Sequence, residues 1–277
     1  MSGQSTHPRD LDGQIALVTG AAQGLGLGIA GTLAQCGAHV IIGDLQEEKA
    51  ATAVNTLRQQ KLIAEFLSLN IADSASVDRG FEQVTRSHGR LDILVNNAGV
   101  GQNVAAIAQL SDQEWQRVIS ITLTGTFYCC RAAARIMEKQ DAGCIVNIAS
   151  INGQNPAALV AAYNVAKAGV ISLTRSLALE LGAYGVRVNA VSPGPVYTEF
   201  NKTVMAQRRQ SLGVSEDQMI ERIRSAIPLG RWGEAEDIAN AVAFLCGPKS
   251  QWITGEVVRV SGGLEGVSAA PPKRGHG

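Results

Sequence analysis

The chain of 277 residues has no excess of charge of either sign, because 24 basic residues are matched by 24 acidic ones. Proteins that bind nucleic acid or anionic membranes need a clustered positive excess, so neither partner is indicated. The first residues, MSGQSTHPRD, lack the apolar core of a signal peptide, and no apolar run is long enough to cross a bilayer. We therefore expect a soluble, cytoplasmic protein that acts on a small molecule.

Cysteine and histidine are also scarce, and both are scattered along the sequence. The five cysteines are odd in number, and no C-x-x-C pair or Cys/His cluster has the spacing of metal ligands. The adjacent Cys129 and Cys130 cannot both face the same side of a helix, which indicates a packing role. The four histidines are equally dispersed. The sequence predicts no metal site, no structural disulfide and no catalytic cysteine.

What the chain does contain is a regular alternation of apolar, β-rich runs with longer helical stretches. Strands are predicted at 14–20, 39–44, 63–70, 91–99, 144–150, 186–194 and 255–263. Strands that alternate with helices of this length form a parallel sheet covered on both faces. No shift in composition marks a domain boundary. We expect one doubly wound α/β domain over 1–277, with its core at 12–264, mobile ends at 1–10 and 268–277, and a substrate lid at about 195–228.

One predicted helix carries two titratable residues among small and apolar ones, in the stretch AAYNVAKAG. Tyr163 and Lys167 are four residues apart, and such positions lie on the same face of a helix. An adjacent positive charge stabilises a phenolate and lowers the pKa of the phenol. Taken alone, this spacing is more typical of an ordinary exposed helix face, so its meaning depends on the rest of the chain.

The turn after the first predicted strand is rich in glycine and reads TGAAQGLGLG. Gly20, Gly24 and Gly26 would let backbone N–H groups approach a pyrophosphate at the positive end of a helix. The literal G-x-G-x-x-G string instead comprises Gly26, Gly28 and Gly31, which would lie inside the following helix. We therefore follow the register that the strand sets.

An acidic residue ends the second predicted strand. Asp44 follows Gly24 by about 20 residues, where a carboxylate accepts hydrogen bonds from both hydroxyls of an adenosine ribose. The same carboxylate would repel a 2′-phosphate, and neither the AAQ of the turn nor Leu45 supplies a compensating positive charge. The sequence therefore favours NAD(H) over NADP(H).

Seven motifs occur in register over about 250 residues. In chain order they are Thr19-Gly-x-x-x-Gly24-x-Gly26, Asp44, Asn96-Asn97-Ala98-Gly99, Ser150, Tyr163-x-x-x-Lys167, Pro193-Gly194 and Thr198. From about Asp12 to Leu264 the chain resembles the compact, single-domain members of the short-chain dehydrogenase/reductase family. The resemblance implies a Rossmann-type parallel sheet of about seven strands and an NAD-dependent oxidoreductase acting on CH–OH donors.

The resemblance also assigns roles to residues. Tyr163 would be the general acid/base, Lys167 would lower its pKa and bind the nicotinamide ribose, and Ser150 would hold the substrate oxygen. Hydride chemistry would belong to NAD. The family further implies a homotetramer or dimer packed through the helices at 111–138 and 155–181. The implied cofactor contacts are Gly20, Gln23, Gly24, Leu25, Gly26, Asp44, Asn70, Ile71, Asn97, Ala98, Gly99, Tyr163, Lys167, Pro193, Gly194, Val196 and Thr198.

Two positions depart from the family pattern. In the long helix predicted to follow a Ser111–Glu114 capping box, relatives usually have an asparagine whose distorted backbone helps hold a proton-relay water, and this chain has Thr122. A threonine can hydrogen-bond back to the preceding turn and bend a helix. Thr122 is therefore kept as a catalytic candidate; its backbone carbonyl is the preferred holder of the relay water, and its hydroxyl is the alternative. Asn70 replaces a common aspartate, and its amide oxygen can accept the same bond from adenine.

The substrate is expected to meet Ser150, Asn152, Gln154 and Tyr163. Amide groups in the stretch INGQNP favour a small polar secondary alcohol, oxidised to its ketone, over a bulky steroid. A 3-oxoacyl thioester reductase remains an alternative, against which Asp44 argues because such enzymes usually take NADPH. An NAD-binding protein of low activity is a further alternative, and the intact Ser150–Tyr163–Lys167 set argues against it.

Overall fold

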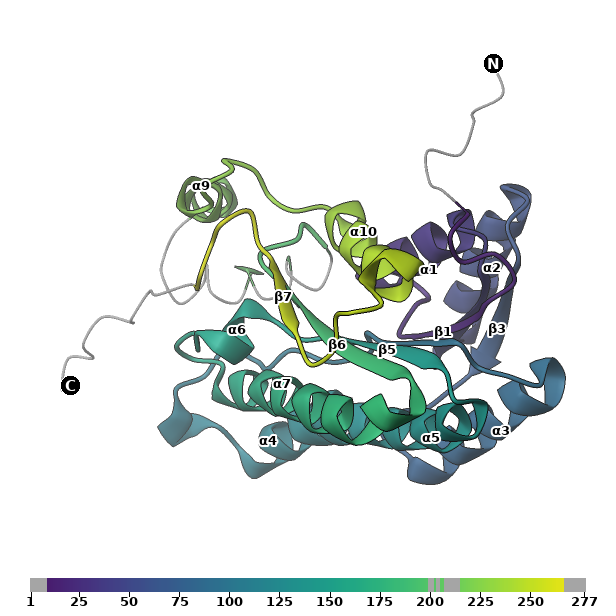
Figure 1. Cartoon of the computed structure of the whole chain (residues 1–277). Helices are drawn as coiled ribbons and strands as arrows, with labels where there is room; N and C mark the ends of the chain where they lie inside the picture. The colour runs from purple at the N-terminus through teal and green to yellow at the C-terminus, as the bar shows by residue number, and fades with distance from the viewer. Residues whose placement is uncertain (1–8, 199–201, 203–204, 207–214, 267–277) are drawn as a thin grey trace, which may run out of the picture.

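Seven parallel strands form one sheet, in the order β3-β2-β1-β4-β5-β6-β7 (Figure 1). The structure is a computed structural model that describes residues 9–198, 202, 205–206 and 215–266. The predicted doubly wound, Rossmann-type fold is confirmed, and the strand order reverses between β1 and β4. The strands are β1 (Ile15–Thr19), β2 (His39–Asp44), β3 (Ala64–Ser68), β4 (Ile93–Asn96), β5 (Gly143–Ile148), β6 (Val186–Pro193) and β7 (Val257–Val260).

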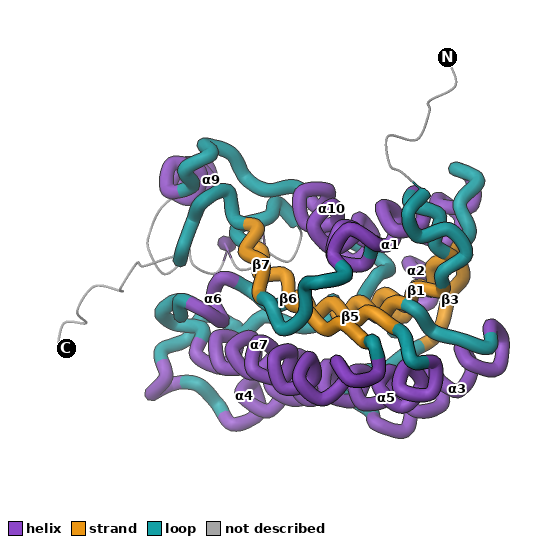
Figure 2. Tube along the Cα trace, in the orientation of Figure 1, coloured by secondary structure: helices purple, strands orange, loops and turns teal. Residues whose placement is uncertain are grey.

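Helices cover both faces of the sheet (Figure 2). One layer consists of α1 (Gly24–Gln35), α2 (Glu47–Gln59) and α10 (Ala235–Cys246). The other consists of α3 (Ser74–His88), α4 (Asp112–Ile119), α5 (Gly125–Gln140) and α7 (Ala161–Leu181). The short α6 (Ile151–Gln154) follows β5, and α9 (Glu216–Ala226) precedes α10. Single 3-10 turns occupy Ile107–Gln109, Gly182–Tyr184 and Pro248–Ser250.

The strands are apolar at nearly every position because both of their faces are buried. In β1, Val18 packs into the core shared with α1, α2 and α10, whereas Leu17 packs against the opposite layer. Val146 and Ile145 of β5 divide in the same way. All four side chains are fully buried. Burial of such a side chain is worth roughly 1.5–3 kcal/mol, so the continuous apolar runs, rather than a two-residue alternation, specify the parallel sheet.

The predicted long helix is interrupted in the middle. A π-helical turn at Ser120–Thr124 separates α4 from α5, and such turns frequently mark functional sites. At the start of α4, the Ser111 hydroxyl accepts a hydrogen bond from the Glu114 N–H at 3.2 Å. The reciprocal half of the predicted capping box is absent, because the Glu114 carboxylate accepts from the Asn103 N–H (2.7 Å) and pairs with Arg117 (2.7 Å).

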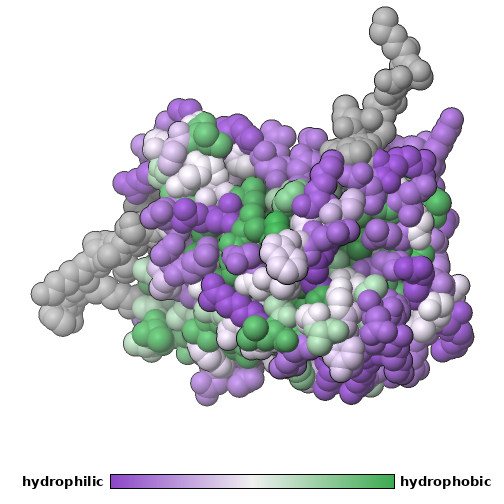
Figure 3. Space-filling view, in the orientation of Figure 1, coloured by the Kyte–Doolittle hydropathy of each residue, from purple (hydrophilic) through white to green (hydrophobic). Residues whose placement is uncertain are grey.

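Among the described residues, no helix has the length and apolar character needed to cross a membrane. On the face shown in Figure 3, hydrophilic residues cover most of the surface, and hydrophobic residues come to the surface over β7 and α7. Two large apolar side chains are almost fully exposed to solvent: Leu179 of α7 is 86% exposed, and Trp252, which precedes β7, is 99% exposed. The predicted mobile ends fall largely in 1–8 and 267–277, which lie outside the described residues.

The literal glycine string lies inside α1, as predicted, and its members differ in what surrounds them. A Cβ atom on Gly26 would lie 2.3 Å from the carbonyl oxygen of Gly20. A Cβ on Gly28 would lie 2.7 Å from the Cβ of Ala235 on α10. A Cβ on Gly31 would meet nothing closer than Leu57, at an ordinary 3.7 Å.

This difference makes a matched pair of variants. Gly31→Ala should raise the free energy of unfolding by about 0.5–1 kcal/mol, because alanine is the better helix former and its methyl group fits. Gly26→Ala gains the same propensity, but it should lower the free energy of unfolding by about 1–3 kcal/mol because the Gly20 carbonyl must move. Urea unfolding of both variants measures the two changes. Shifts of the same sign would show that Gly26 is not held by close packing.

Candidate active site

A cavity of about 840 Å³ opens at the carboxyl ends of the central strands, where the strand order reverses. Its lining includes every residue predicted to contact the cofactor, from Gly20 to Thr198, and also Ser150 and Asn152. Two predicted site residues, Thr122 and Gln154, are not part of the lining. The fold therefore brings nearly all of the predicted residues together, and their contacts with ligands stay predictions.

The glycine-rich turn fits a dinucleotide. Gly20 and Gly24 have φ angles of +63° and +58°, in the left-handed region that favours glycine. A Cβ on Gly20 would lie 2.7 Å from the Cα of Ala98, whereas one on Gly24 would have no neighbour within 4 Å. The residue before α1, Gln23, forms no side-chain cap. The first N–H groups of α1 therefore remain available to an anion beside open space.

The end of β4 holds this turn in place. The Asn97 side-chain amide donates hydrogen bonds to the carbonyl oxygens of Thr19 (3.0 Å) and Gly20 (2.9 Å). In return, the Thr19 hydroxyl accepts from the N–H groups of Asn97 and Ala98, each at 3.1 Å. These four bonds fix the turn relative to the neighbouring strand.

Asp44 lies in the cavity wall at the end of β2 and is only 8% exposed. Its carboxylate accepts hydrogen bonds from the N–H groups of Ala22 and Gln46, both at 3.0 Å. A cation that the sequence analysis did not consider lies near this end of the cavity. Lys49 of α2 donates to the side-chain oxygens of Gln23 (2.9 Å) and Gln46 (2.8 Å), both of which line the cavity. The packing of α2 brings Lys49 to Gln23 and Gln46, and this proximity cannot be read from the turn or from Leu45.

Ser150, Tyr163 and Lys167 meet on the opposite wall. Ser150 precedes α6, and its hydroxyl accepts from the Asn152 N–H (3.1 Å) and hydrogen-bonds the Tyr163 phenol. Tyr163 and Lys167 share a face of α7, as the spacing predicted, with Lys167 Nζ 5.9 Å from the centre of the tyrosine ring. The ammonium group donates to the carbonyl oxygen of Ile148, at the end of β5, at 2.6 Å.

Burial shifts the pKa values of both members of this pair. It raises the pKa of the Tyr163 phenol, and the hydrogen bond from Ser150 only partly opposes this. It lowers the pKa of Lys167 to about 8. The ammonium group is directed to the Ile148 carbonyl oxygen. The expectation that Lys167 lowers the pKa of Tyr163 stays a prediction.

A largely apolar wall, which the sequence analysis missed, completes the cavity. Met205, Met219, Ile223 and Leu264 line it, together with the Arg222 side chain. Three of these residues belong to α9, which lies in the predicted substrate lid (195–228); residues 199–201, 203–204 and 207–214 of that lid lie outside the described residues. The stretch SEDQ was the available signal, because Ser215 and Gln218 form a complete capping box at its start.

Thr122 lies in the π-helical turn and is fully buried. Its hydroxyl donates to the Val100 carbonyl oxygen (3.2 Å) and accepts from the Val100 N–H (3.0 Å). Its own carbonyl oxygen accepts from the Thr126 hydroxyl at 2.9 Å. The expected distortion of the helix is present, but the hydroxyl ties the turn to the segment after β4 instead of bonding back to the preceding turn.

Two variants of Thr122 separate its hydroxyl from its shape. In Thr122→Val the Val100 N–H loses its partner, so its amide should exchange with deuterium at least about tenfold faster, equivalent to a loss of about 1.4 kcal/mol in local stability. Thr122→Ser keeps the hydroxyl and should leave this exchange rate within about threefold of wild type. Hydrogen exchange followed by NMR measures both. Equal acceleration in the two variants would mean that packing, and not the hydrogen bonds, holds this segment.

The chain is similar to known proteins over most of its length. A family model described as enoyl-(acyl carrier protein) reductase matches residues 20–265. The 3-oxoacyl-(acyl-carrier-protein) reductase FabG of Aquifex aeolicus is 36% identical over 255 residues, which cover 92% of this chain and 98% of the relative. The FabG protein of Escherichia coli K12 is 38% identical over the same shares of both chains. A solved structure of an actinorhodin polyketide ketoreductase variant with NADPH superposes with a TM-score of 0.88 at 33% identity, covering 95% of this chain and all of the other.

Proposed function

The chain belongs to the short-chain dehydrogenase/reductase family, and on that premise we propose that it reduces the ketone of a 3-oxoacyl thioester with NADH. Enzymes of this family act on a CH–OH or carbonyl group with a nicotinamide cofactor. The observation that carries the proposal is one cavity that holds Ser150, Tyr163 and Lys167 on one wall and the Asp44 carboxylate on another. The first three residues supply the acid/base chemistry, and Asp44 selects the cofactor.

The cofactor supplies hydride transfer when it is bound, and the chain's residues manage the proton. Tyr163 Oη is the proton donor to the substrate carbonyl oxygen, and Ser150 provides a second donor beside it. A raised phenol pKa keeps Tyr163 protonated at neutral pH, which is the form that reduction requires. We base the ketone-to-alcohol direction on the similarity to the 3-oxoacyl reductases, in place of the oxidation expected from the sequence.

Lys167 is a positioning and proton-supplying group in this scheme. With a pKa of about 8, it is still mainly protonated at neutral pH, and it lies in the cavity wall beneath Tyr163. Thr122 lies outside the cavity lining, and its carbonyl oxygen, the group expected to hold a relay water, accepts a hydrogen bond from the Thr126 hydroxyl at 2.9 Å. We therefore place Thr122 outside the group of catalytic residues.

The apolar wall supports an acyl substrate. Met205 and Met219 are almost fully buried, and with Ile223 and Leu264 they offer a surface for an alkyl chain. Arg222, from the same wall, provides a cation for the phosphates of a carrier. The small polar alcohol remains a second candidate because Asn152 lines the cavity, but its other expected partner, Gln154, does not.

The substrate test compares ketones and one variant. Wild type should reduce acetoacetyl-CoA with NADH at least tenfold more efficiently, in kcat/KM, than a polar 2-keto sugar acid. Tyr163→Phe removes only the proton donor, so it should lose about 10²–10⁴-fold in turnover and keep its affinity for NADH within about twofold. Fluorescence titration of NADH provides the binding control. A Tyr163→Phe enzyme that keeps a tenth of the activity would overturn the assignment, and turnover of neither ketone would favour a protein of low activity.

The cofactor test addresses Asp44. Wild type should prefer NADH to NADPH by about 100-fold in kcat/KM, because the Asp44 carboxylate, held by two backbone N–H groups, would repel a 2′-phosphate. The double variant Asp44→Ala/Leu45→Arg should reverse this preference. Leu45→Arg alone is the matched control and should change the ratio by less than about fivefold, because a surface ion pair contributes at most about 1 kcal/mol. An enzyme that already uses both cofactors equally would contradict the role given to Asp44.

Self-association through the second helical layer also stays a prediction. Leu179 of α7 is 86% exposed, and Phe127 of α5 and Val165 of α7 are 40% and 47% exposed. Apolar side chains gathered on the helices that the family resemblance assigns to subunit contacts support a dimer or tetramer.

A further inference from the structure

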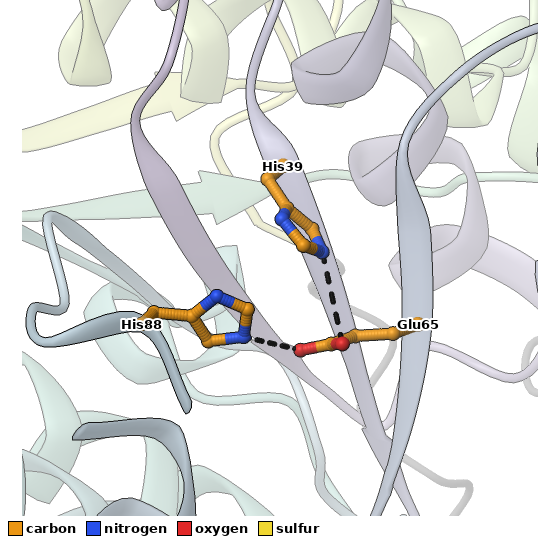
Figure 4. A group of neighbouring side chains, drawn as sticks. All are labelled: His39, Glu65 and His88. Atoms are coloured by element: carbon orange, nitrogen blue, oxygen red, sulfur yellow. Dashed lines mark hydrogen bonds and ion pairs between the residues drawn. The ribbon is translucent and has the colours of Figure 1, made fainter. Parts of the chain in front are cut away.

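Two of the four histidines, although distant in sequence, meet around one carboxylate at the edge of the sheet (Figure 4). His39 is the first residue of β2, Glu65 is the second residue of β3, and His88 is the last residue of α3. The histidines are scattered in the sequence, but the parallel pairing of β2 with β3 brings His39 close to Glu65. Asp44 ends β2, so the cluster lies roughly 16 Å from the cavity, at the opposite end of the strand.

The three side chains form a compact cluster. His88 Nε2 lies 2.6 Å from one carboxylate oxygen of Glu65, and His39 Nε2 lies 3.8 Å from the other. The two imidazole rings are nearly perpendicular, with their centres 4.8 Å apart. All three potential ligand atoms are within 4.8 Å of one another. Figure 4 shows both rings turned toward the carboxylate from different sides.

This donor set suits a particular class of cation. Two imidazoles and one carboxylate are typical ligands of zinc and similar transition metals, whereas magnesium and calcium prefer oxygen ligands alone. Ligands about 2.1 Å from a tetrahedral metal are about 3.4 Å from each other. To close the site, atoms as far apart as 4.8 Å would move together by about 1.4 Å, and the His88 and Glu65 atoms, now 2.6 Å apart, would separate by about 0.8 Å. The side chains are 13–35% exposed, which leaves them room to rotate and leaves a fourth position to water.

The surrounding charges are mixed. His88 ends α3, and the carbonyl groups of a helix C-terminus attract a cation. The Glu65 carboxylate adds one negative charge. Arg58 opposes both, because it lies near His39 and its Nε donates to the Ala64 carbonyl oxygen at 2.8 Å. The guanidinium is thus held by a backbone group, and it is not one of the three side chains that would bind the metal.

We propose that His39, Glu65 and His88 bind one divalent transition-metal ion of the zinc class, with water completing the coordination. The ion would tie the starts of β2 and β3 to the end of α3. Its distance from the cavity gives it a structural role and no part in the reaction. The contrasting outcome is a metal-free cluster in which Glu65 only hydrogen-bonds the imidazoles.

The binding test uses the full chain without a histidine tag. Zn²⁺ affinity is measured by competition with a chromophoric chelator, and Co²⁺ reports coordination through its visible absorption. The variants are His39→Phe and His88→Phe, which keep an aromatic ring of similar size, and Glu65→Gln. The matched control is His7→Gln/His276→Gln, which removes the two histidines outside the cluster. The five cysteines are buried in the folded protein and should not compete for the metal.

We expect one Zn²⁺ per chain, with an affinity about 100-fold or more weaker in each ligand variant and unchanged in the control. The Co²⁺ spectrum of wild type should show intense four-coordinate bands that His39→Phe and His88→Phe lose. Zn²⁺ should raise the Tm of wild type but not of His88→Phe, and Mg²⁺ should raise neither. Turnover in metal-free buffer, equal in all variants, shows that each has folded.

Two results would overturn the proposal. One is Zn²⁺ binding by His39→Phe or His88→Phe as tight as by wild type. The other is loss of binding in the His7→Gln/His276→Gln control, which would place the metal elsewhere. If either phenylalanine variant does not fold, Glu65→Gln decides the matter, because it preserves shape and a hydrogen bond while removing the charged ligand.

Discussion

The whole site depends on the contact between the ends of β1 and β4, where the strand order of the sheet reverses. The backbone groups that follow these two strands lie beside the cavity, so side chains must satisfy them. Thr19 and Asn97 do this for each other, and Gly20 approaches Ala98 so closely that no side chain would fit. Once this contact is formed, the first turn of α1 is directed at the cavity. The geometry of the glycine-rich turn between β1 and α1 is therefore a consequence of sheet topology as much as of the glycines.

A second buried network connects α7, the helix that carries Tyr163 and Lys167, to the sheet. The Asn96 amide donates to Asn147 (2.8 Å), the Asn147 amide donates to Thr174 of α7 (2.9 Å), and the Thr174 hydroxyl donates to the Val170 carbonyl (2.8 Å). All three polar side chains are almost fully buried. In a medium of low dielectric such bonds favour one arrangement, because an unpaired buried polar group is costly. Among the described residues, the side-chain oxygen of Asn96 is the one atom of this network left without a partner. The hydrogen bonds fix the register of α7 on β4 and β5, and thereby the height of Tyr163 and Lys167 in the cavity.

The sequence was a good guide where the physics is local. A strand buried on both faces must be apolar throughout, and a glycine with positive φ leaves a visible mark, so the strands and the turn could be predicted. Several features escaped the sequence because they depend on packing. Lys49 meets Gln23 and Gln46 only through the packing of α2, and the direction of the Tyr163 pKa shift is set by burial that no spacing reveals. The helix α9 was missed although its capping box is visible in the stretch SEDQ, whereas the distortion at Thr122 was expected. His39 and His88 are likewise brought together only by the order of β2 and β3.

Two electrostatic effects on the cofactor preference oppose each other: the Asp44 carboxylate repels a 2′-phosphate, and the Lys49 ammonium attracts one. Their relative magnitudes decide which effect is larger. Relatives such as the polyketide ketoreductase were solved with NADPH, and Lys49 gives this chain a cation at the right end of the cavity. However, a phosphate charge about 4 Å from a carboxylate costs about 4 kcal/mol at an effective dielectric constant of 20. Two backbone N–H groups hold the Asp44 carboxylate in place, so it cannot turn away from such a charge. An exposed lysine offsets at most about 1 kcal/mol. The difference supports the proposal of NAD(H), because the carboxylate is fixed and buried whereas the lysine is exposed to solvent.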